Sequence, residues 1–183
     1  MDIMLDLETL GTDPYSPVIA IGAVRFDARN PLTIHKLQDA DIFYQVITLE
    51  SCMAAGLKPS ASTIQWWMTE KTLTPAARAI FADLAALALP LALDAFTDWL
   101  NSAPDTLWGN SAEFDCGLLR GCYKALGKEV PWLFYKQGCY RTIKNLQAAK
   151  GIELIRVGTH HNAVDDALSQ AEHLCRIFQA LKL

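Results

Sequence analysis

The segment DIMLDLETLG, residues 2–11, decides the fold class of this 183-residue chain. Apolar residues at positions 3, 5 and 7 alternate with Met4, Asp6 and Glu8, which is the pattern of a β-strand with two different faces. Asp6 and Glu8 are two positions apart and so share one face. Charged side chains at the centre of a sheet are stable only when they are paired or bound to a metal. The alternative is a strand end with two solvated acids, and this segment alone leaves both open.

Strand and helix signals follow one another along the rest of the chain. β-branched apolar runs predict strands, and longer periodic stretches broken by Gly or Pro predict helices. Three early strands followed by alternating helices and strands indicate one α/β domain with a mixed sheet over residues 1–183. The expected strands are Asp2–Glu8, Val18–Phe26, Ile42–Ile47, Thr106–Gly109 and Trp132–Tyr135, and the expected helices are Ser111–Leu126, Tyr140–Ala149 and Ala163–Leu181, with a mostly helical stretch over 50–101.

Composition and charge narrow the classes of protein. With 51% hydrophobic and 20% charged residues, the chain has the composition of a globular domain. Its 16 basic and 20 acidic residues give a formal charge of −4, which excludes nucleic-acid binding through bulk charge. Eight basic and two acidic residues lie between 120 and 156, so a local phosphate-binding surface remains open beside the simpler interpretation of a solvated surface.

The termini and cysteines predict the compartment. The first residues lack a basic targeting segment, and the longest apolar run, residues 84–93, is too short to span a bilayer. The five cysteines show no C-x-x-C spacing, which favours neither a zinc site nor a disulfide framework. We therefore expect a cytoplasmic protein that does not contact a membrane.

Two further acidic segments are candidates for the same site. Asp115 lies at a predicted strand-to-helix junction, where Glu113 has the same local environment and an acid also suits the first helical turn. Residues 160–166 (HHNAVDD) contain two overlapping His-x-x-x-x-Asp pairs. Helical phase places Asp166 beside the apolar stripe of the following helix and Asp165 on a solvated face, so Asp166 is predicted to face inward. An ordinary N-terminal acid beside a loop histidine is the alternative.

Together these segments predict phosphoryl chemistry. Hard divalent cations prefer oxygen ligands, and two such ions can activate a water and stabilise the leaving oxygen of a phosphodiester. A histidine just before the last acid can act as general base on that water.

The order of these motifs resembles that of the DEDDh 3′–5′ exonucleases over nearly the whole chain. The Trp66-Trp67 pair and residues 139–142 (CYRT) are similar to the exonuclease VIII-like, 3′–5′ exoribonuclease-like branch. The matching motifs are residues 5–11 (LDLETLG), Gly109-Asn110 followed by Phe114-Asp115, and residues 161–167 (HNAVDDA).

The resemblance implies a ribonuclease H-like α/β fold, with a mixed five-stranded sheet flanked by helices. It implies two divalent ions, Mg²⁺ or Mn²⁺, and hydrolysis from the 3′ end of single-stranded DNA or RNA to nucleoside 5′-monophosphates. By position, the metal ligands are Asp6, Glu8, Asp115 and Asp166, and the general base is His161. The expected substrate contacts are Thr9, Leu10 as a base-stacking wedge, Gly11, Asn110, Phe114, Trp67 and Arg141.

Other functions remain open from the sequence. One is a nucleic-acid-binding module on the same fold without catalysis, and another is a phosphoesterase for very short oligonucleotides. The sequence does not distinguish RNA from DNA, because that needs a located contact to the 2′-hydroxyl. A homodimer is also open, with residues 84–93 as one candidate contact.

Overall fold

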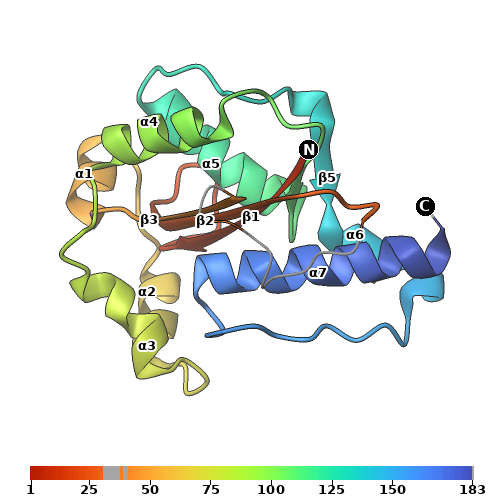
Figure 1. Ribbon diagram of the computed structural model, residues 1–183. Coiled ribbons are helices and arrows are strands. Elements are labelled where there is room, and N and C mark those ends of the chain that lie inside the picture. Colours follow the sequence, from red (N-terminus) through yellow and green to blue (C-terminus); the bar gives the residue numbers. More distant parts are fainter. Residues whose placement is uncertain (31–37, 39–40, 183) are drawn as a thin grey trace.

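A single mixed sheet forms the centre of the computed structural model, which describes residues 1–30, 38 and 41–182 (Figure 1). Five strands in the described residues have the order β3-β2-β1-β4-β5. β2 is antiparallel to β1 and β3, whereas β4 is parallel to β1 and β5. This confirms the expected α/β fold with a mixed five-stranded sheet. The strands are β1 (Asp2–Thr9), β2 (Val18–Phe26), β3 (Ile42–Val46), β4 (Leu107–Gly109) and β5 (Gln137–Cys139).

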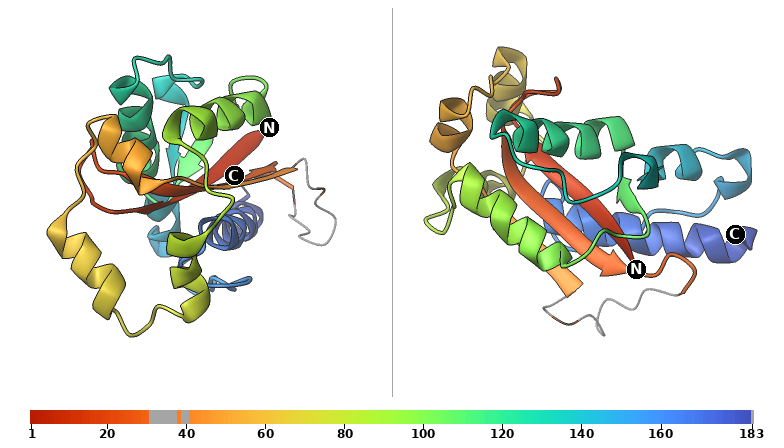
Figure 2. Two further views of the ribbon diagram at one scale, coloured as in Figure 1. Left: turned by 90° about the vertical axis from the view of Figure 1, so that its left-hand side faces the viewer. Right: turned by 90° about the horizontal axis from the view of Figure 1, so that it is seen from above.

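Helices cover both faces of the sheet. α4 and α5 lie on one face and α7 crosses the other, as Figures 1 and 2 show. Within the described residues, none of the helices combines the length and apolar character that a membrane crossing requires. The helices are α1 (Leu49–Ala54), α2 (Ala61–Thr69), α3 (Pro75–Arg78), α4 (Leu89–Leu100), α5 (Gly117–Ala125), α6 (Tyr140–Lys144) and α7 (Ala163–Leu181).

The alternation of β1 separates the core from the acidic side chains. Ile3, Leu5 and Leu7 pack in the cluster that contains residues of α4 and α5. Met4, on the opposite face, packs with the apolar residues of α7. Asp6 and Glu8 continue that second face, so both carboxylates come to lie beneath the beginning of α7.

A glycine in β2 lets α7 approach the sheet at this point. Gly22 pairs with Asp6 across the two strands. A Cβ atom at Gly22 would lie 2.1 Å from the carbonyl carbon of Ala163 and 2.3 Å from the nitrogen of Val164. Backbone at that distance leaves no room for a side chain, so the glycine sets how closely the first turn of α7 approaches Asp6.

The fifth strand is not where the sequence pattern predicted it. Residues 132–135 were expected as a strand, but Trp132 is buried against Tyr123, with 5.7 Å between ring centroids, and Phe134–Lys136 form a 3₁₀ turn. β5 follows at Gln137–Cys139. Its Gly138 lies under the ring of Trp108, where a Cβ would be 2.3 Å away. The Trp108 ring of the neighbouring strand therefore leaves room only for glycine at this position, although glycine has a low strand propensity.

Two predicted helices are also divided. In place of one helix over 111–126, a π-helical turn spans Ala112–Cys116 and α5 follows it. The stretch 140–149 contains the short α6 and a 3₁₀ turn, Gln147–Ala149. Pro75 and Pro90 lie in the first turns of α3 and α4, where a missing backbone N–H costs no helical bond.

Replacing Gly22 with alanine should destabilise the fold. The added methyl overlaps the backbone of Ala163, and overpacking of this kind costs about 1–3 kcal/mol. We expect a lower denaturation midpoint in urea than for the unchanged protein.

Gly117→Ala is the matched control. Gly117 has helical backbone angles and a Cβ there meets nothing within 4 Å, so alanine should raise stability by roughly 0.5–1 kcal/mol. Equal effects of the two substitutions would contradict the close approach of α7 to Gly22.

Candidate active site

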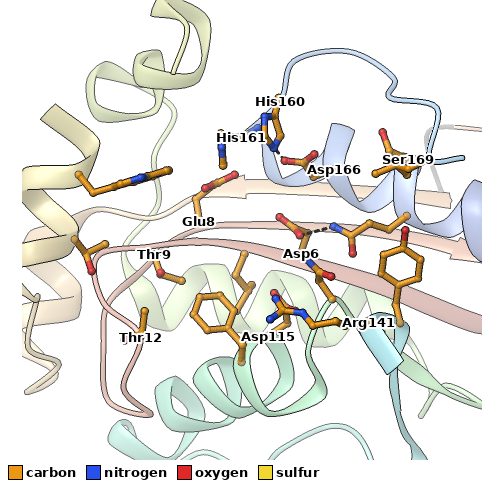
Figure 3. A pocket seen from close by; sticks show the side chains of 18 of the residues that line it. Asp6, Glu8, Thr9, Thr12, Asp115, Arg141, His160, His161, Asp166 and Ser169 are labelled. Atoms are coloured by element: carbon orange, nitrogen blue, oxygen red, sulfur yellow. Dashed lines mark hydrogen bonds between the residues drawn. The ribbon is translucent and has the colours of Figure 1, made fainter. Parts of the chain in front are cut away.

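Carboxylates from three elements face one pocket. Figure 3 shows Asp6 and Glu8 of β1 lying between Asp166 above and Asp115 below. One carboxylate oxygen from each of Asp6, Glu8 and Asp166 lies within 4.8 Å of the other two. Glu8, Asp115 and Asp166 are 6%, 2% and 8% exposed. The sequence therefore places four acids, far apart in the chain, around one small volume.

The beginning of α7 orients Asp166. Asn162 caps the helix by accepting hydrogen bonds from the backbone N–H groups of Val164 and Asp165. Asp166 then points into the pocket, and its Oδ2 accepts a hydrogen bond from the His161 N–H at 2.8 Å. Asp165 points elsewhere, because its Oδ2 accepts from the Thr159 N–H at 2.7 Å. The structure thus brings Asp166, and not Asp165, to the other acids.

The π-helical turn after β4 orients Asp115. The Oδ2 of Asp115 accepts a hydrogen bond from the Ser111 N–H at 3.1 Å, and the Ser111 hydroxyl accepts from the Phe114 N–H. Phe114 and Asp115 line the pocket, whereas Glu113 is not in its lining. Wide π turns often occur at functional sites, because the extra residue re-aims a side chain.

The electrostatics of this cluster favour a bound cation. Burial raises the pKa of Asp6 well above its usual value, and the charges of Asp115, Glu8 and Asp166 raise it further. Burial, then Asp166 and Asp115, raises the pKa of Glu8 to about 8. Burial also raises the pKa of Asp115 to about 7, against hydrogen bonds from backbone N–H groups that lower it. Such carboxylates cannot all ionise at neutral pH unless a positive charge lies among them.

His161 lies at the mouth of the pocket beside Asp166. Its backbone adopts φ 62°, a left-handed conformation that is costly for a residue with a side chain and that clusters at functional sites. Its ring stacks on His160, with 3.8 Å between centroids, and meets the Trp66 ring edge-on at 5.2 Å. Burial and the neighbouring His160 lower the pKa of His161. The imidazole is therefore neutral at neutral pH and able to accept a proton.

The pocket has a volume of about 470 Å³ and contains most of the residues expected from the sequence. Leu10 and Gly11 are outside its lining, and Leu10 is 2% exposed and packs among Ile19, Trp67 and Leu73. The lining residues that the sequence anticipated are Asp6, Glu8, Thr9, Trp67, Asn110, Phe114, Asp115, Arg141, His161 and Asp166, and Trp66 and Lys144 also line the pocket.

The two tryptophans have different positions. Trp67 is 3% exposed, and its indole N–H donates a hydrogen bond to the carbonyl of Thr9 at 2.9 Å. Trp66 is 36% exposed and lies beside His161. Trp67 thus fixes the end of β1, and Trp66 offers the accessible aromatic face.

Two residues that the sequence motifs do not identify also contact the acids. The Nε2 of Gln170 donates to the Oδ1 of Asp6 at 2.7 Å, and its buried Oε1 has no hydrogen-bond partner in the described residues. The Nη1 of Arg156 lies 2.7 Å from the Oδ1 of Asp166. Gln170 is four residues after Asp166 on the same helical face, and that spacing is the signal that could have identified it. Arg156 belongs to the basic stretch, but no local pattern aims it at Asp166.

Basic and polar groups complete the opposite wall. The backbone N–H of Arg141 donates to the carbonyl of Asn110 at 3.1 Å, and the Lys144 ammonium donates to the Asn110 side-chain oxygen at 3.2 Å. Arg141 and Lys144 both line the pocket from α6. Neither cation has an ion pair with the carboxylates within the described residues, and cations in such a position are suited to a phosphate that enters between them.

Solved nuclease structures share this fold at low sequence identity. The nuclease domain of 3′hExo, a DEDDh family member bound to rAMP, is 16% identical with a TM-score of 0.58, over 97% of this chain and 91% of that chain. Pop2p from S. pombe, in its Mg²⁺- and Mn²⁺-bound form, is 15% identical with a TM-score of 0.61, over 97% and 82%. Cell-death related nuclease 4 (CRN-4) is 16% identical with a TM-score of 0.61, over 97% and 63%. These likenesses identify the sheet and its helices as the ribonuclease H-like fold.

The family comparison covers almost the entire sequence. None of the curated proteins matches it. The family model of the 3′-5′ exoribonuclease Rv2179c-like domain matches residues 1–178, which include all three acidic motifs. This chain therefore belongs to the 3′-5′ exoribonuclease Rv2179c-like domain family and is a 3′–5′ exonuclease.

Proposed function

We propose that residues 1–183 act as one domain that removes nucleotides from the 3′ end of single-stranded nucleic acid and releases nucleoside 5′-monophosphates. The observation that supports this most is the buried, mutually repelling cluster of Asp6, Glu8 and Asp166 next to His161. Such a cluster destabilises the folded protein, and bound cations would offset the repulsion among its carboxylates.

The residues present fit two divalent ions, Mg²⁺ or Mn²⁺. Asp6, Glu8, Asp115 and Asp166 would hold them, since all four offer the oxygen ligands that hard cations prefer. The unpartnered Oε1 of Gln170 adds an acceptor beside Asp6. When bound, the ions supply a more acidic water and neutralise charge on the phosphodiester.

His161 takes the role of general base. Its neutral imidazole accepts a proton from the attacking water while the water oxygen bonds to phosphorus and the bond from phosphorus to the 3′ oxygen of the preceding nucleotide breaks. The hydrogen bond from its own backbone N–H to Asp166 fixes the base relative to the acids. Its lowered pKa keeps it in the proton-accepting form at neutral pH.

Residues in the walls of the pocket offer contacts for the bases and phosphates of the substrate strand. The exposed face of Trp66 is available for stacking by a base, and Thr9, Asn110 and Phe114 line the same pocket. Arg141 supplies positive charge for phosphates. Stacking and phosphate contacts carry little sequence information, so we expect weak base preference.

A strand labelled at either end tests the direction of cleavage. In Mg²⁺ or Mn²⁺, a 3′-end label should be released at once as a mononucleotide, whereas a 5′-end label should give a descending ladder. Chelator should stop both reactions. Immediate release of the 5′ label would contradict the proposal, and activity on a dinucleotide but not on a long strand would favour a short-oligonucleotide phosphoesterase.

Adjacent carboxylates provide a matched pair of variants. Asp166→Asn removes a proposed metal ligand and should reduce kcat/KM by at least about 100-fold, because the ions supply several kcal/mol of stabilisation. Asp165→Asn changes the neighbouring carboxylate, which accepts a hydrogen bond from the Thr159 N–H, and the amide oxygen of the variant can still accept that bond. It should keep near-normal turnover, and comparable losses in both would argue against Asp166 as a ligand.

Stability of the metal-free protein should depend on pH in an unusual direction. The folded-state pKa values of Asp6, Glu8 and Asp115 are raised, so the folded protein binds protons more tightly than the unfolded chain. Stability is then fully present below the usual carboxyl pKa and is lost as pH rises through about 7 to 8. In chelator, the melting temperature should fall from pH 5 to pH 8.

Divalent cation provides the control for that measurement. Mg²⁺ binds only the ionised carboxylates of the folded state, so it should reverse the decline above pH 7. A melting temperature that rises with pH in chelator, or one that does not change when Mg²⁺ is added, would contradict the electrostatic account of the cluster.

A further inference from the structure

Arg156 pairs with one of the acids of the cluster. Its Nη1 is 2.7 Å from the Oδ1 of Asp166, and its side chain is 46% exposed, so it reaches from the pocket rim to the acid. Two other ion pairs in the described residues, Met1 with Asp105 and Lys128 with Asp94, involve no residue of the pocket lining. Arg156 therefore provides positive charge at the site where carboxylates otherwise repel one another.

The loop that carries Arg156 is held on both sides of it. The Val157 N–H donates to the Ser169 hydroxyl at 2.9 Å, which ties the loop to α7. Before Arg156, the carbonyl of Ile152 accepts from the Nε2 of His173 at 2.7 Å, and the Nδ1 of that ring accepts from the Tyr140 hydroxyl at 2.6 Å. These bonds fix the backbone, so the long guanidinium side chain is the part that can change partner.

A divalent ion at the carboxylates reverses the electrostatics that hold Arg156. Around empty carboxylates, the guanidinium is attracted by the Asp166 carboxylate that it contacts. Once cations share those oxygens, the same position places positive charges next to one another. A phosphodiester bound at the ions then offers the guanidinium the nearest negative oxygens, and the planar guanidinium binds such oxygens in pairs.

We propose that Arg156 is a metal-dependent phosphate-binding residue, which pairs with Asp166 in the metal-free protein and with a substrate phosphate when divalent cations are bound. This inference rests on the proposed function of the same pocket. Arg141 and Lys144 line the pocket from α6, so the strand's phosphates would pass between that helix and the 150–162 loop. In this role, Arg156 makes the affinity for the strand depend on metal in a second way, in addition to the direct contacts between the ions and the phosphate.

Arg156→Ala tests this through two affinities with opposite expected changes. In calorimetry without nucleic acid, Mg²⁺ should bind the variant about threefold or more tightly, since a partly exposed competing ion pair is removed. In Mg²⁺, a fluorescent single strand with a hydrolysis-resistant phosphorothioate at its 3′ linkage should bind about tenfold more weakly, because a charge-assisted contact is lost.

Lys150→Ala is the matched control, because it removes one positive charge from the exposed beginning of the same loop. Both affinities should stay at the level of the unchanged protein. An equal loss of strand binding in the Lys150 and Arg156 variants would show a bulk charge effect and overturn the proposal.

A purely structural Arg156 gives a different pattern. If it only holds Asp166 in place, its removal weakens Mg²⁺ binding and leaves strand affinity in Mg²⁺ unchanged, and either result overturns the proposal. Failure of the unchanged protein to cut an end-labelled strand would instead overturn the proposed function, while the calorimetric comparison would still report on Arg156.

Discussion

Repulsion among buried carboxylates is the constraint on which this structure depends. Asp6 and Glu8 belong to the central strand of the sheet, where water cannot stabilise their charge. Asp115 and Asp166 are then brought to them from two other elements, which increases the cost. The fold tolerates this because Asp6, Asp115 and Asp166 each accept a hydrogen bond from a neighbouring group and because the cluster can exchange protons for cations. The same unfavourable energy that limits stability therefore provides the driving force for metal binding.

Folding and function share β1 through its alternation. Its odd-numbered residues build the apolar core beneath α4 and α5, and its even-numbered residues reach the pocket under α7. The close contact of Gly22 with the first turn of α7 aligns Asp166 with Asp6. Because the acids are attached to the sheet or to elements packed directly on it, the site is preorganised before any ligand enters. Trp67 extends this rigidity to the end of the strand through its bond to Thr9.

The features that depend on local sequence could be predicted, whereas those that depend on tertiary packing could not. A period of two in β1 and the helical phase after Asn162 were enough to predict the strand face of Asp6 and the inward direction of Asp166. The fifth strand was misplaced because residues 132–135 have strand propensity, whereas the real strand exists through its pairing with β4 and the Trp108 ring over Gly138. Leu10 matched a motif position but is buried outside the pocket lining, and Trp67 lines the pocket with only 3% of its surface exposed. The contacts of Gln170 and Arg156 depend on how α7 and the 150–162 loop meet β1, which no window of sequence encodes.

The central claim is that Asp6, Glu8, Asp115 and Asp166 together form a divalent metal site. Anomalous diffraction from crystals of the protein in Mn²⁺ tests it most directly, because the scattering locates the ions independently of activity. The account predicts strong anomalous peaks within coordination distance of these four carboxylates, with the guanidinium of Arg156 displaced from Asp166. Peaks at His160 and His161 alone, or none in a crystal of enzyme that Mn²⁺ activates, would contradict it.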